Sequence, residues 1–160
     1  MEWLSISFFK PFLSWVLNFV QGRLGVDRDH DVAIFRKIDA IGTESRIDQI
    51  LNSRIYNSRL NREDHHTLGD LIEALSRIEN RFLDSTLQKA AEELRDEMTE
   101  LLGFVSRTFF SVSGGWHKFY PDPIDKDYYD KQWAELCSKL EKSWETYKSF
   151  RMTVKKRLKT

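Results

Sequence analysis

The chain has 160 residues, of which 41% are hydrophobic and 31% charged, and its formal net charge is zero. A chain of this length can bury a full core, and its balance of apolar and charged residues excludes an intrinsically disordered protein. The single cysteine excludes an intramolecular disulfide and a thiolate-rich metal site. Seven glycines and three prolines favour long helices with few connections.

The stretch over residues 2–24 is apolar on nearly every side, with a narrow polar stripe spaced as one edge of a helix. Lys10 and Pro11 near its centre disfavour a membrane-spanning helix. Two interpretations then carry equal weight: docking on a membrane surface or protein partner, and the centre of a helical bundle. The candidate docking residues are Trp3, Phe8, Phe9, Phe12, Trp15 and Phe19.

This stretch also lacks the basic start and the cleavage site of a secretory signal. We therefore expect a cytoplasmic protein that is associated with the membrane, if at all, through its N-terminal helix.

Residues 26–160 are predicted to form a helical bundle domain, because apolar residues recur there at helical spacing. The predicted helices cover residues 29–41, 43–55, 64–78, 85–109 and 125–159. Asp84 or Ser85 is a suitable N-cap for the fourth of these. The last helix is long enough that we expect its final turns to project beyond the bundle. The fold class is all-α: an antiparallel helical bundle with a separate apolar N-terminal helix over residues 1–25 and a long C-terminal helix.

No strand is predicted, and residues 111–124 are expected to form a loop, since they contain Gly114, Gly115, Pro121 and Pro123. An aromatic loop is a good recognition element, because aromatic rings anchor binding hot spots. We favour the alternative, in which this loop folds back and caps the open end of the bundle. The aromatic candidates for loop recognition are Trp116, Phe119 and Tyr120.

The C-terminal residues 148–160 carry cations and no acidic residue, so the rest of the chain has an acidic excess. Such a cluster fits an anionic surface or nucleic acid. The favoured interpretation is simpler: cations stabilise the negative C-terminal end of a helix dipole. The candidate anion-binding residues are Lys148, Arg151, Lys155, Lys156, Arg157 and Lys159.

Catalytic motifs are weak, and we expect neither an enzyme nor a cofactor or metal site. Glu63 and His66 have the spacing of half a di-metal carboxylate site, but no second half is present. A remaining enzymatic alternative would bring His30 and Asp31 into one pocket with residues 63–66.

The sequence thus predicts a non-enzymatic interaction or scaffold protein whose apolar N-terminal helix docks to a membrane or protein partner. Binding of nucleic acid or an anionic surface through the basic C-terminal helix end is the alternative. If both termini meet on one side, the two would form a joint membrane contact. The oligomeric state is left open.

Overall fold

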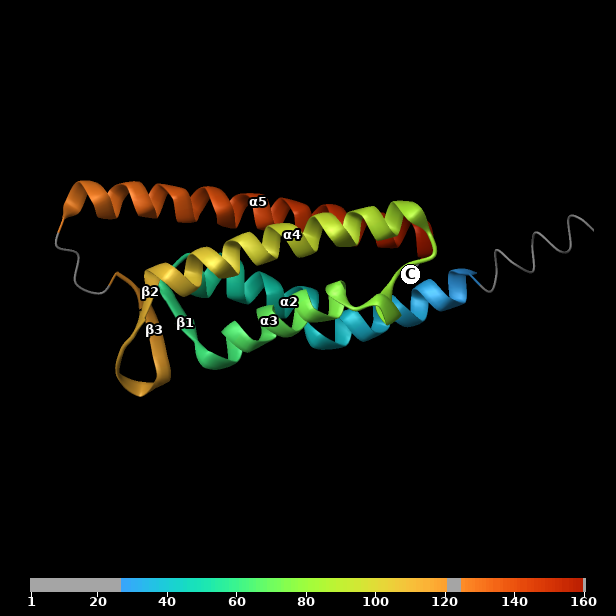
Figure 1. Ribbon diagram of the computed structural model, residues 1–160, viewed down its shortest axis with the longest axis horizontal. Coiled ribbons are helices and arrows are strands. Elements are labelled where there is room, and N and C mark those ends of the chain that lie inside the picture. Colours follow the sequence, from blue (N-terminus) through green and yellow to red (C-terminus); the bar gives the residue numbers. More distant parts are fainter. Residues whose placement is uncertain (1–26, 121–124, 160) are drawn as a thin grey trace, which may run out of the picture.

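The computed structural model describes residues 27–120 and 125–159, and the protein is mostly helical there, as predicted (Figure 1). The expectations for residues 1–25, including Trp3, Phe8, Phe9, Phe12, Trp15 and Phe19, fall outside the described residues. After a helix over residues 27–41, the elements are α2 (Glu44–Asp48), the π-helix η1 (Gln49–Ile55), β1 (Arg59–Asn61), α3 (Arg62–Ser76), the 3₁₀-helix η2 (Ile78–Asn80), α4 (Ser85–Thr108), β2 (Phe109–Ser111), the 3₁₀-turn η3 (Ser113–Gly115), β3 (Trp116–Phe119) and α5 (Lys126–Leu158).

The two longest helices, α4 and α5, lie side by side and antiparallel (Figure 1). Lys142 Nζ lies 2.6 Å from Glu97 Oε1, and Lys139 Nζ lies 3.6 Å from Glu100 Oε2, so the residue numbers run in opposite directions along the pair. The facing apolar stripes are buried, as the helical spacing predicts. They include Leu94, Met98, Leu101, Leu136 and Leu140.

A second group of helices lies below α4 and α5 in the view of Figure 1. It consists of the helix over residues 27–41, α2, η1 and α3. The sequence predicts a buried stripe here, and the structure confirms it, because all four of its members have an exposed fraction of 0%. They are Ile47, Ile50, Leu51 and Ile55.

A small antiparallel sheet, with strand order β1-β3-β2, closes one end of the helices (Figure 1). The prediction of a strand-free loop was therefore wrong for residues 111–119. Gly114 and Gly115 have φ of 76° and 77°, which glycine adopts without strain, and they turn the chain between β2 and β3. Strands of three or four residues are too short to show the alternation that identifies a strand in a sequence.

The predicted end of α3 was wrong, since Ile78 is 83% exposed and the helix ends at Ser76. The side chain of Asn80 donates a hydrogen bond of 2.9 Å to the carbonyl of Ala74, which satisfies one of the last carbonyls of α3. The amide of Asn80 thus competes with continuation of the helix.

The last turns of α5 also differ from the prediction, because they do not project into solvent. Val154 and Leu158 are each only 2% exposed. They belong to the same buried core as Ile34 and Ile38, from the helix over residues 27–41.

Candidate functional site

The two ends of the described chain meet at the end of the molecule opposite the sheet (Figure 1). The guanidinium of Arg28 donates hydrogen bonds of 3.1 and 2.8 Å to the carbonyl of Leu158, through Nε and Nη2. The last carbonyls of a helix lack intrahelical donors and carry negative partial charge, so a cation stabilises them. An open cavity of about 730 Å³ lies here, and its walls include Asp27, Lys156 and Lys159.

The buried carboxylate of Asp31 connects the first helix to the loop before α4 at this end of the molecule. It is 2% exposed, and its two carboxylate oxygens accept hydrogen bonds from the backbone N–H groups of Leu83 and Asp84, at 2.7 and 2.9 Å. Asp84 in turn accepts from the N–H groups of Thr86 and Leu87 as the N-cap of α4, and forms an ion pair with Arg157. The first helix, the loop before α4 and the end of α5 are thereby tied into one unit.

The pKa of Asp84 reflects these contacts. Burial acts to raise it, but the hydrogen bonds from Arg157 and from the Leu87 and Thr86 amides outweigh burial, and the pKa lies below its usual value. The carboxylate is therefore stabilised in its charged form.

The six C-terminal cations divide into two groups. Lys148 pairs with Glu145 at 2.6 Å, Arg151 pairs with Asp39, and Arg157 pairs with Asp84. Within the described residues, the other three cations form no ion pair, and their side chains are exposed: Lys155, Lys156 and Lys159.

Two exposed apolar side chains belong to the same end, and sequence reasoning missed both as surface candidates. Ile78 and Leu83 are 83% and 56% exposed, in the connection between α3 and α4. This connection contacts the first helix through a hydrogen bond of 3.2 Å between His30 Nε2 and the carbonyl of Arg81. Ile78 stands between Arg77 and Glu79, which was a signal available in the sequence, whereas Leu83 directly follows the buried Phe82 and carried no such signal.

The aromatic residues predicted for loop recognition lie on and just after β3. Phe119 is 3% exposed, and its ring packs 5.3 Å from Tyr129 and 5.4 Å from Trp133, measured between ring centroids. Trp116 is 38% exposed, with Arg54 above its ring. The Tyr120 hydroxyl lies 3.3 Å from that of Tyr128, and this hydrogen bond, with burial, raises the pKa of Tyr120 to about 12.

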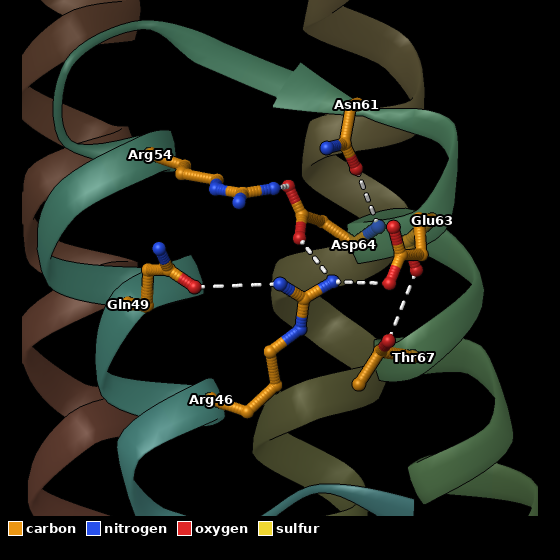
Figure 2. A network of polar contacts seen from close by, with 7 residues as sticks. All are labelled: Arg46, Gln49, Arg54, Asn61, Glu63, Asp64 and Thr67. Atoms are coloured by element: carbon orange, nitrogen blue, oxygen red, sulfur yellow. Dashed lines mark hydrogen bonds and ion pairs between the residues drawn. The ribbon is translucent and has the colours of Figure 1, made fainter.

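Asp64 forms the most enclosed ionic cluster in the described part of the chain. Its side chain is 0% exposed, and it lies between two guanidinium groups that point at it from α2 and η1 (Figure 2). Arg54 Nη1 donates to Oδ2 at 2.5 Å, and Arg46 Nη2 lies 2.9 Å from Oδ1. Arg46 also pairs with Glu63, so this cluster joins α2 and η1 to the start of α3.

The residues of the enzymatic alternative are not brought together. Asp31 lines the cavity at the chain ends, whereas His65 and His66 line another cavity beside the sheet. Cys137 is half-buried, and burial raises the pKa of its thiol, which disfavours the reactive thiolate. Residues 27–120 and 125–159 contain no cluster of three or more potential metal ligands in a suitable arrangement.

The chain is similar to no protein-family model, no curated protein and no solved structure at a significant level. Among the described helices, none combines the length and the apolar character needed to cross a bilayer.

Proposed function

We propose that the protein is a non-enzymatic interaction module, a helical bundle that docks on an anionic membrane surface through residues 1–24 and its C-terminal cations. The observation that carries the proposal is the pair of hydrogen bonds from Arg28 to the carbonyl of Leu158. The apolar stretch is covalently joined to residue 27, so it is tethered at the same end as Lys155, Lys156 and Lys159.

The apolar stretch supplies the larger share of the binding free energy. Burial of 400 Å² of apolar surface contributes about 10 kcal/mol before the costs of ordering and immobilisation. Exposed Ile78 and Leu83 add apolar surface at the same end. The stretch contains Trp3, Trp15 and several phenylalanines, side chains that favour the interface between headgroups and acyl chains.

Lys155, Lys156 and Lys159 supply a smaller, salt-dependent part of the binding free energy. A lysine near an anionic bilayer contributes about 1 kcal/mol, and this attraction falls off within a Debye length. The alternative of nucleic-acid binding is less favoured, because Lys148, Arg151 and Arg157 are held in ion pairs within the protein.

Vesicle flotation with the full-length chain tests the proposal. Neutral phosphatidylcholine vesicles should float the protein even at high salt, and vesicles containing phosphatidylserine should bind it more tightly at low salt. The double substitution Phe12→Asp and Phe19→Asp should abolish both, because charged side chains are costly inside the interface.

A matched pair of triple variants tests the contribution of the C-terminal lysines to vesicle binding. Replacement of Lys155, Lys156 and Lys159 by Gln should weaken binding to anionic vesicles by roughly tenfold to a hundredfold at low salt. Replacement of Lys118, Lys126 and Lys131, which are exposed at the sheet end of the molecule, should leave it unchanged. Equal losses in the two variants, or no flotation of the wild-type chain, would refute the proposal.

A further inference from the structure

An open cavity of about 680 Å³ lies beside the sheet, where the start of α3 and the end of α4 meet the strands. Its volume falls within the usual range for small-molecule sites. The polar part of its lining consists of Arg62, His65, His66 and His117, together with serine residues. No aspartate or glutamate is among the residues that line it.

Hydrogen bonds determine which ring nitrogens of His65 and His66 are donors and which are acceptors. The hydroxyl of Ser106 donates to the carbonyl of Leu102 at 2.8 Å, so it accepts from Nε2–H of His65 at 3.2 Å. Nε of Arg62 donates to Nε2 of His66 at 3.3 Å, and this ring nitrogen is therefore an acceptor. The N–H of the neutral His66 ring is then on Nδ1.

Two side chains of this lining have nitrogen atoms without a hydrogen-bond partner among the described residues. Within the described residues, the terminal Nη groups of Arg62 have no hydrogen-bond or ion-pair partner. Nδ1 of His117 is enclosed and has no hydrogen-bond partner in the described part of the chain. A planar guanidinium with free N–H groups matches the geometry of a phosphate or carboxylate.

The two carboxylates that follow Arg62 in the sequence are engaged by other cations. Glu63 lies 3.0 Å from Arg46, and Asp64 is enclosed between Arg46 and Arg54. The cavity is also lined by apolar side chains, among them Val105, Phe109 and Phe110. A lining that combines one guanidinium and several imidazole rings with apolar side chains suits an anion attached to a compact apolar group.

We infer that this cavity binds a small organic anion, a phosphate or carboxylate carried on an aromatic or aliphatic group. The guanidinium of Arg62 and the imidazole rings recognise the anion, and the apolar lining recognises the group that carries it. The site is separate from the membrane-docking end, since the 21-residue separation of Ser85 and Ser106 along α4 corresponds to about 30 Å.

Titration of the full-length chain with phenyl phosphate, followed through the ring protons of its four histidines by NMR, tests the inference. Resonances of His65, His66 and His117 should shift and saturate, with a dissociation constant on the order of 1 mM or tighter. His30 lies at the other end of the molecule and serves as the internal reference. Phenol, which lacks the charge, should produce little shift at the same concentration.

A matched pair of arginine variants completes the test. Arg62→Gln should weaken phenyl phosphate binding by about tenfold or more, because it removes a charge-assisted donor. Arg59→Gln, three residues earlier on an exposed position of β1, should leave binding unchanged. The inference is overturned if the three resonances do not move, if His30 moves equally, if phenol binds as well, or if the two variants weaken binding equally. Inorganic phosphate that binds as tightly as phenyl phosphate would overturn the role assigned to the apolar lining residues.

Discussion

Asp31 and Asp64 are carboxylates that the protein encloses almost completely, at 2% and 0% exposure. Each is stabilised in a different way: the Asp31 carboxylate accepts hydrogen bonds from two backbone amides, and the Asp64 carboxylate pairs with two guanidinium groups (Figure 2). Burial of a charge is costly unless such partners are present. Both residues therefore fix how neighbouring elements are arranged.

Asp64→Asn should lower the free energy of unfolding by about 2 kcal/mol or more, because it leaves Arg46 and Arg54 without their shared charge partner. Urea unfolding followed by circular dichroism measures this change. Glu63→Gln is the control: this neighbour is 79% exposed, and its loss should cost less than about 0.5 kcal/mol. Similar losses for the two variants would contradict the role of the buried cluster.

The histidines beside the sheet should make stability depend on pH. Burial, followed by the charges of His66 and His117, lowers the pKa of His65 below its usual 6.5. His65 therefore binds a proton more readily in the unfolded chain than in the folded chain. The free energy of unfolding is highest above pH 6.5 and falls as the pH drops below it. Unfolding measured between pH 7.5 and 5 should show a shallower decline for His65→Gln than for wild type. An unchanged slope in His65→Gln would count against this account.

Among the elements, the helices were predicted from the sequence because each helical stripe is local information. The stripe of α4, for example, repeats over 24 residues and starts at an N-cap, Asp84, that its side-chain chemistry identifies. The sheet was not predictable in this way. Leu60 pairs with His117, far along the chain, and no short-range pattern encodes such a pairing.

The candidate sites were predictable to a smaller degree. Asp64 was missed, although it stands four residues before Leu68 and seven before Leu71 on the buried face of α3. A carboxylate in an apolar stripe is a recognisable sign of a buried ionic cluster. The partners Arg46 and Arg54, by contrast, come from different helical segments and follow only from the tertiary arrangement.

The end of α5 provides a direct test at the scale of one element. Leu158→Ala should lower the free energy of unfolding by about 2 kcal/mol, because this side chain is 2% exposed in the core. Met152→Ala, on the same helix at 66% exposure, should change it by less than about 0.5 kcal/mol. Thermal or urea unfolding of both variants distinguishes a packed helix end from one that projects into water.

For the molecule as a whole, the described structure has two chemically different ends. At one end, Arg28 contacts Leu158 through hydrogen bonds. Exposed lysines and the exposed apolar side chains of Ile78 and Leu83 belong to the same end. The other end carries the small sheet (Figure 1). The cavity lined by histidines lies beside this sheet. Our two proposals assign different ligands to these two ends, so each can fail without the other.

Hydrogen exchange of the full-length chain, measured by mass spectrometry with and without phosphatidylserine-containing vesicles, tests the central claim most directly. The account predicts that vesicles slow exchange in residues 1–26 and in the connection around Leu83, and leave the β2–β3 hairpin unchanged. Vesicle-induced protection confined to the hairpin end, or none in residues 1–26, would contradict it.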